Sequence, residues 1–433
     1  MIKYIKVFLI FISLYFILHT VLVYGGFGIS KTIVSFSKEI LWFWFFIIVA
    51  LKFSRSSIDF IKKYNLLFLA ILGLILIGSI ITFYQWGINN ESIKNIIIWL
   101  KYGVLYMFIF YTALRIWYIF KNTIDQKDFI RWIYYFYLTI LCAGFLVQLS
   151  KILFPQLWYD IWFRTIDIFR PEQAPPIYYL TNVDGFVRLS WLFSWPNNYW
   201  FWLVWVFAVL IWWRQLNIQV KHDIFSKIMY IVSALLNLGR SIWVGIIMQT
   251  ILYIKKQNIF FRFKKTFYTI GVVAIIGLIY MTYHKRDSTL KHFDSTVNAF
   301  MKFLNNPRWY GLWSSWPGVY YNGFILPENY YLQAMIDFGI IGFLLILGFW
   351  VYIFRYSRKI NNFFKSKDKD DVESNILTSD KMNYMYLSWF LGMCVVGLFL
   401  HVFEDSMVNY LIFVPWGIIM WSLMWRSNKL NQS

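Results

Sequence analysis

Glu328 stands directly before a long apolar segment and is followed by Asn329 and Tyr330, in the stretch ILPENYYLQAMIDFGIIGFLLILGFW (residues 325–350). A carboxylate at the edge of an apolar helix can act as a general base toward a hydroxyl group. The amide and phenol groups beside it could orient that hydroxyl. The same carboxylate could instead cap a helix, because it follows Pro327 and an acidic residue in a first helical turn complements the helix dipole.

Arg188 and Arg240 are cations at positions that local helix energetics disfavours. Each lies at the start of an apolar segment, in FVRLSWLFSWPNNYW and SALLNLGRSIWVG, where a helix N-terminus carries partial positive charge. An anion held between the arginine and the helix end would stabilise this arrangement, and the planar guanidinium suits phosphate or pyrophosphate. Ion pairs with Asp184 or Glu172, or contact with lipid phosphate, are the structural alternatives.

Other side chains in the sequence could also bind substrate or take part in the chemistry. Trp309, Trp313 and Trp316 could stack on sugar rings, or form the aromatic belt that marks a membrane interface. His401 begins the segment HVFED and could orient a site or pair with an arginine. The 5 histidines and 2 cysteines show no metal-ligand spacing, so we expect no metal ion.

The composition indicates an integral membrane protein of the all-α class. The 433 residues are 60% hydrophobic and only 14% charged, and the mean hydropathy is +0.55, which leaves too little polar surface for a soluble chain of this length. The N-terminal segment begins with basic residues and shows no small-residue cleavage site. We therefore expect it to be the first transmembrane span. We expect a polytopic helical protein with about 12 transmembrane spans near residues 6–24, 38–54, 65–84, 94–120, 128–153, 191–213, 225–239, 241–254, 266–283, 333–354, 385–403 and 409–425.

The basic residues predict the orientation of these spans. With the N-terminus inside, the inner segments hold 27 of the 41 lysines and arginines, as the positive-inside rule requires. Both termini are then cytoplasmic, and the net charge of +20 needs no nucleic acid to explain it. The chain 1–433 is expected to be one integral membrane domain. It has two long extracytoplasmic loops, 154–190 and 284–332, and a cytoplasmic loop at 355–384.

Three segments together resemble the O-antigen polymerase and ligase superfamily, bacterial membrane glycosyltransferases that act on undecaprenyl-linked sugars. They are RLSWLFSWPNN (188–198), LNLGRSIWVG (236–245) and NNPRWYGLWSSWPGVYYNGFILPENYYLQAMIDFGIIG (305–342). The last is similar to the family's order of an Asn-Pro, a glycine-bearing aromatic stretch, a His/Glu-Asn-x-Tyr-Leu element and a glycine-containing helix. The resemblance covers roughly residues 188–342, and the N-terminal half matches in hydropathy alone.

The resemblance implies a specific reaction at the outer face of the bacterial cytoplasmic membrane. Arg188 and Arg240 would bind the lipid pyrophosphate, and Glu328 would activate the acceptor hydroxyl, with no cofactor and with inversion at the anomeric carbon. Asn329, Tyr330 and His401 would orient the substrate, and Trp309, Trp313 and Trp316 would hold sugars. By analogy with the family, a flippase and a chain-length regulator are possible partners.

Four functions can be weighed against these observations. The first is a polymerase that joins undecaprenyl-pyrophosphate-linked oligosaccharide units into an O-antigen, capsule or exopolysaccharide. Ligases of the superfamily usually carry histidine where this chain has Glu328, which favours the polymerase over a ligase. A lipid-linked sugar flippase would predict paired repeats and charges near the membrane midplane, and neither is evident. A polyprenyl-phosphate-sugar transferase needs an acid in its first outer loop, and GGFGISKTIVSFSK contains none.

Overall fold

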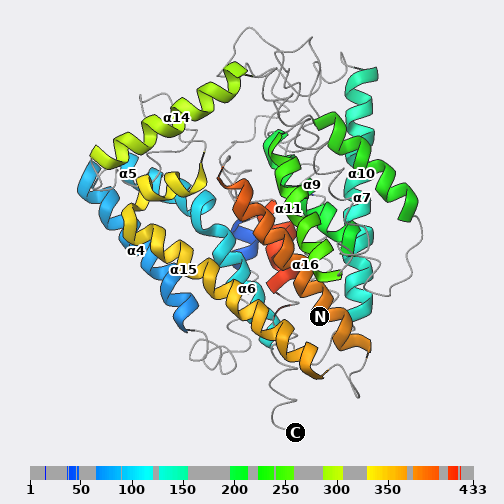
Figure 1. Cartoon of the computed structure of the whole chain (residues 1–433). Coiled ribbons are helices and arrows are strands. Elements are labelled where there is room, and N and C mark those ends of the chain that lie inside the picture. Colours follow the sequence, from blue (N-terminus) through cyan, green and yellow to red (C-terminus); the bar gives the residue numbers. More distant parts are fainter. Residues whose placement is uncertain are drawn as a thin grey trace.

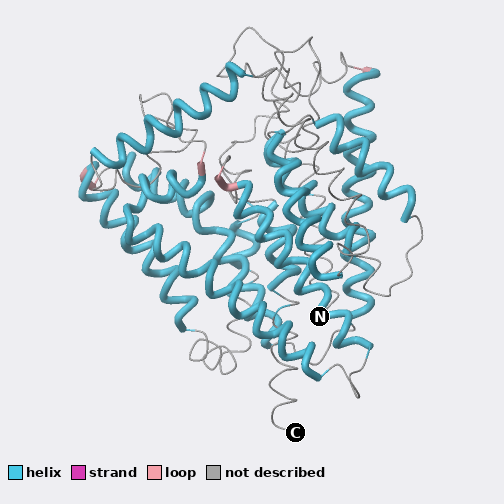
Figure 2. The backbone as a smooth tube through the Cα atoms, viewed as in Figure 1, coloured by secondary structure: helices cyan, strands magenta, loops and turns pink. Residues whose placement is uncertain are grey.

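The fold is seen in a computed structural model that describes only part of the chain. The described residues are 15, 37, 39–44, 46–47, 65–88, 90–119, 126–154, 196–212, 223–237, 240–257, 286–305, 329–367, 374–398, 408–417 and 420. They are almost all helical, and none of them forms a strand (Figure 2). This confirms the all-α fold class. The expected spans 6–24, apart from Tyr15, and 266–283 lie outside the described residues.

Most of the labelled helices pack side by side in a bundle, and α14 lies across one end of it (Figure 1). In chain order they are α4 (Asn65–Trp86), α5 (Asn90–Trp99), the π-helical segment η1 (Leu100–Val104), α6 (Leu105–Ile119), α7 (Gln126–Leu153), α9 (Pro196–Trp212), α10 (Asp223–Asn237), α11 (Arg240–Gln257), α14 (Arg286–Asn305), α15 (Tyr330–Lys367) and α16 (Ser374–Val396). Residues 408–417 form a further helix.

Two of the described helices are long and apolar enough to cross a membrane: Leu66–Tyr84 of α4 and Tyr330–Arg358 of α15. The apolar parts of α6, α7, α9, α10, α11 and α16 are shorter, at 10 to 17 residues. Since about 20 residues are needed to span the hydrocarbon core, the number of 12 spans and their orientation stay predictions.

Local sequence signals explain several helix ends. Pro196 begins α9, where its missing N–H costs nothing. Gly87 follows α4 with φ of 72°, and its N–H donates to the carbonyl of Phe83 at 2.9 Å, which ends the helix in the left-handed conformation that glycine adopts most easily. Helices extend into the segment 355–384, whose placement as a cytoplasmic loop stays a prediction. The helix α15 continues to Lys367, and α16 begins at Ser374.

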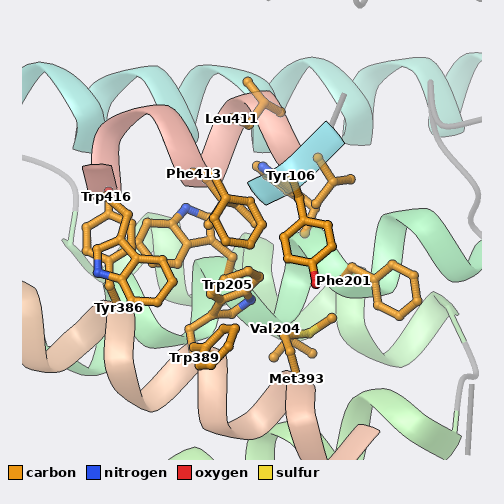
Figure 3. Packing of buried hydrophobic residues seen from close by; sticks show 14 of the residues in the cluster. Tyr106, Phe201, Val204, Trp205, Tyr386, Trp389, Met393, Leu411, Phe413 and Trp416 are labelled. Atoms are coloured by element: carbon orange, nitrogen blue, oxygen red, sulfur yellow. The ribbon is translucent and has the colours of Figure 1, made fainter. Parts of the chain in front are cut away.

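The core is a cluster of aromatic side chains at the centre of the bundle (Figure 3). Trp205 of α9 stacks on Tyr386 of α16 with ring centroids 4.3 Å apart, and Tyr386 stacks in turn on Trp416 at 5.8 Å. Trp389 and Phe413 complete the contact between α16 and residues 408–417, at 5.7 Å. Such pairs contribute beyond their buried area, so the cluster fixes α9, α16 and residues 408–417 relative to one another.

On the outside of the bundle, apolar side chains are exposed. One face of α4 is buried, including Leu67, Ile71 and Leu74. The opposite face exposes Leu76 and Ile80 by 60% and 65%, and Leu66 and Leu69 similarly. A helix that is apolar all round, with one half in contact with protein and the other half exposed, is what lipid contact requires.

Candidate functional site

The start of α15 is bound to the end of α16. The N–H of Tyr330 donates to the carbonyl of Gly397 at 2.9 Å, and the side-chain amide of Asn329 donates to the carbonyl of Leu398 at 3.0 Å. The Asn329 side-chain oxygen accepts a hydrogen bond from the N–H of Leu332, also at 3.0 Å. Asn329 is therefore the N-cap of α15, and the same side chain joins two helices.

Tyr330 points into the bundle. Only 3% of its surface is exposed, and its ring stacks on Trp350 with centroids 5.6 Å apart and an angle of 10°. Its hydroxyl lies 3.4 Å from the Tyr106 hydroxyl, which accepts a shorter hydrogen bond of 2.9 Å from the Trp350 indole N–H. These contacts give Tyr330 a structural role. Its predicted role in orienting substrate stays a prediction.

The first segment of α15 also buries polar side chains to which the sequence analysis assigned no role. Gln333 and Asp337 are 2% and 1% exposed, and with Tyr330 they recur at helical spacing on one buried face. The hydroxyl of Tyr331 donates to the carbonyl of Cys394 at 2.6 Å and ties this segment to α16 a second time. The spacing of Tyr330, Gln333 and Asp337 was the available signal, and it is weak because it fits an ordinary amphipathic helix equally well.

The helix α15 is broken at Gly339. This residue has φ of 66° and ψ of −173°, a conformation that is essentially confined to glycine. The segments before and after it run in different directions (Figure 1). A Cβ on Gly342 would come within 2.1 Å of the Phe338 Cβ, so the bend needs a second glycine on its inner side. We refer to residues 330–338 as the outer arm and to 340–367 as the long segment.

The first residue of α11, Arg240, lies toward the same end of the bundle as the outer arm. A Cβ on Gly245 would be 3.2 Å from Val396, and one on Gly392 would be 3.2 Å from the Gly245 carbonyl, so α11 and α16 pack closely and antiparallel. Gly245 is thus level with the end of α16. Arg240, five residues earlier, begins about 7.5 Å further toward the junction of α15 and α16.

The helix α9 reaches the same end beside α11. A Cβ on Gly245 would also be 3.1 Å from Val204, and the Gln249 side-chain amide donates to the Val204 carbonyl at 2.8 Å. In Figure 3 Trp205, Val204 and Phe201 of α9 follow one another in the direction in which Tyr386, Trp389 and Met393 of α16 do, so α9, like α11, runs antiparallel to α16. The beginning of α9 at Pro196 therefore also faces the junction. Three helices, α9, α11 and α15, therefore direct their N-termini toward one end, where their dipoles favour an anion.

Most of the predicted site residues lie outside the described part of the chain. These are Glu328, Arg188, His401, Trp309, Trp313 and Trp316, together with the side chain of Arg240. Their positions in the chain are still informative. Glu328 directly precedes Asn329, and His401 comes three residues after Leu398. Both are therefore close in the chain to the two residues that the Asn329–Leu398 hydrogen bond joins.

The comparisons with known proteins leave the family open. No protein-family model matches the chain, and no curated protein is significantly similar to it in sequence. Among the residues that the structure describes, no group of three or more His, Cys, Asp or Glu side chains is arranged to hold a metal ion. The prediction that the site uses no cofactor is untested.

Proposed function

We propose that this protein is a membrane glycosyltransferase that polymerises undecaprenyl-pyrophosphate-linked oligosaccharide units into a surface polysaccharide. The growing glycan on one lipid carrier is transferred to a sugar hydroxyl on a second lipid-linked unit. The protein acts as a multi-pass protein of the bacterial cytoplasmic membrane, with its site facing outside. This reading rests on the sequence resemblance and on the arrangement of the described helices.

The observation that carries the proposal is the convergence of three chain segments at one end of the bundle. The Asn329–Leu398 hydrogen bond joins the segment that follows Glu328 to the segment that precedes His401. The close packing of Gly245 against Val396 brings the start of α11 to the same end. The segment that follows Glu328, the segment that precedes His401 and the first residue of α11, Arg240, thus lie at one end of the bundle, although Arg240 and His401 are 161 positions apart in the chain.

Each proposed role follows from the chemistry of the group. Glu328 takes the proton of the acceptor hydroxyl, whose oxygen forms the new bond to the anomeric carbon of the donor glycan. The bond between that carbon and the pyrophosphate oxygen breaks, and undecaprenyl pyrophosphate leaves with the electron pair. Arg188 and Arg240, with the N-termini of α9 and α11, stabilise the negative charge that develops on the pyrophosphate. One in-line displacement inverts the anomeric configuration.

The test compares glycans from cells that express the wild type, Glu328→Gln or Glu373→Gln at matched membrane abundance. The Glu328→Gln change keeps the shape of the side chain but removes its ability to accept the proton. Glu373→Gln makes the same chemical change in the loop predicted at the opposite side of the membrane. We expect a ladder of chain lengths from the wild type and from Glu373→Gln, and single lipid-linked units from Glu328→Gln.

Two other results would contradict the proposal. A ladder that persists in Glu328→Gln means that Glu328 has no role as a base. A wild type that makes no ladder but moves whole glycans to a different carrier is a ligase. The apparent melting temperature of Glu328→Gln in detergent is measured in parallel, because a helix-capping role would lower the melting temperature as well as the activity.

A further inference from the structure

The helix α14 exposes a continuous stripe of large apolar side chains. Its members are Leu290, Phe293, Val297, Phe300, Met301 and Leu304, with exposed fractions from 39% for Val297 to 65% for Phe293. At about 3.6 residues per turn, all six fall within an arc of about 100° on the helix. An apolar patch of this kind, on a helix that is otherwise polar, marks an interaction surface.

The other two faces of α14 have different environments. Ala299 and Phe303 are buried against Leu332 and Ile336 of the outer arm, and this small apolar cluster attaches the helix to the bundle. Asn298, like Asp294 and Asn305, is exposed and lies on the polar flank beside the stripe. The helix thus has one face on protein, one polar face and one uncovered apolar face.

The position of α14 indicates what covers the stripe. The helix lies at the end of the bundle where α15 begins, and it runs crosswise to the long segment of α15 (Figure 1). Directly after the outer arm that holds α14, the chain exposes Ile340 and Ile341, by 57% and 49%. The apolar surface continues from there along Leu344, Leu347 and Val351 of a helix long enough to cross a membrane.

We propose that α14 is an interfacial helix whose apolar stripe inserts into the outer leaflet of the lipid bilayer. A helix with a narrow apolar face and a polar flank, placed crosswise at the end of membrane-crossing helices, settles at the boundary between headgroups and acyl chains. The stripe then continues the lipid-facing surface of α15, and the polar flank faces water. A second protein copy would have to displace lipid from that continuous surface. This proposal requires that the protein is embedded in a bilayer, and it holds whether or not the protein catalyses the transferase reaction.

The test places a fluorescent bimane label on one cysteine of the full-length protein, after Cys142 and Cys394 are replaced by serine. Val297→Cys puts the label on the stripe, and Asn298→Cys puts it on the polar flank one residue away. Both side chains are exposed, so neither substitution disturbs packed core. The proteins are reconstituted in vesicles of phosphatidylethanolamine and phosphatidylglycerol.

We expect nitroxide attached to the lipid acyl chain to quench the label at position 297 several-fold more than the label at 298. Aqueous iodide should show the reverse order. Equal quenching of both labels by iodide would place the stripe in water and overturn the proposal. Protection of position 297 from both quenchers, with a disulfide forming between two Val297→Cys chains, would show that a second copy covers the stripe and would overturn it as well.

Discussion

The side-chain amide of Asn329 donates a hydrogen bond to the backbone carbonyl of Leu398, 69 residues later in the chain, at 3.0 Å. The same side chain accepts from the N–H of Leu332. One residue therefore caps the N-terminus of α15 and fixes α15 to α16. Asparagine suits this position because its amide is donor and acceptor at once.

Replacing Asn329 should separate these two contributions. Asn329→Ala removes the cap and the bond to Leu398, and we expect it to lower the free energy of unfolding by about 2 kcal/mol, from about 1 for the cap and about 1 for the hydrogen bond. Asn329→Asp keeps an acceptor for Leu332 and loses the donor to Leu398, so its loss should be smaller. Apparent melting temperatures in detergent measure the order. Equal stability of Asn329→Ala and wild type would contradict the assignment.

The hydroxyls of Tyr106 and Tyr330 should differ in importance. Tyr106→Phe removes the acceptor of the Trp350 indole N–H at 2.9 Å and leaves a buried donor unsatisfied, which costs about 1–3 kcal/mol. Tyr330→Phe gives up a longer contact of 3.4 Å to Tyr106, while its ring keeps the stack on Trp350. We expect Tyr106→Phe to melt at the lower temperature. If Tyr330→Phe melts as wild type but loses ladder synthesis, its hydroxyl acts on the substrate.

The close packing of α11 on α16 should make Gly392 intolerant of a side chain. A Cβ there would lie 3.2 Å from the Gly245 carbonyl and 3.3 Å from Gln249, and the backbone atom cannot move aside cheaply. Gly392→Ala is expected to lower the melting temperature and the yield of folded protein. Gly348→Ala is the matched control, because nothing lies within 4 Å of a Cβ on this glycine in α15. It should be neutral, or stabilising by about 0.5–1 kcal/mol. Equal behaviour of the two variants would exclude a tight α11–α16 contact.

The break in α15 should depend on Gly339. Alanine at φ of 66° and ψ of −173° is strained by about 1–3 kcal/mol, so Gly339→Ala is expected to destabilise the protein or to straighten the helix. A straight helix would move the outer arm away from α16. A pair of cysteines at Asn329 and Leu398 reports this directly, since their crosslinking yield should fall in the Gly339→Ala background and persist with Gly348→Ala. An unchanged yield would show that the arm keeps its place without the break.

Hydropathy located most of the described helices but could not give their contacts. The prediction for residues 65–84 agrees with α4, because an uninterrupted run of Leu and Ile determines both the helix and its length. The break at Gly339 was missed, because it lies inside a run that is equally apolar on both sides. A helix at Arg286–Asn305 was missed too, since its stripe is diluted by polar residues in a segment interpreted as loop.

The candidate site illustrates a second limit of sequence reasoning. Asn329 and Tyr330 after Glu328 were predicted to orient the substrate together, and their residue types gave no reason to expect different environments for them. In the structure Asn329 caps a helix, Tyr330 is buried on Trp350, and Tyr331 bonds to Cys394. Which direction a side chain faces depends on the turn of α15 relative to α16, and that turn is fixed by partners 63 or more residues away in the chain. Glu328 itself stays a prediction.

The π-helical segment Leu100–Val104 between α5 and α6 gives this bundle a place where its chain length can vary. A π turn is equivalent to an α-helix that has gained one residue. Losing one residue there would leave a regular helix with α5 and α6 still facing their present neighbours, whereas a deletion elsewhere would rotate the following helix by about 100°. In an alignment of homologous chains, single-residue gaps within the membrane helices should therefore gather at these five positions.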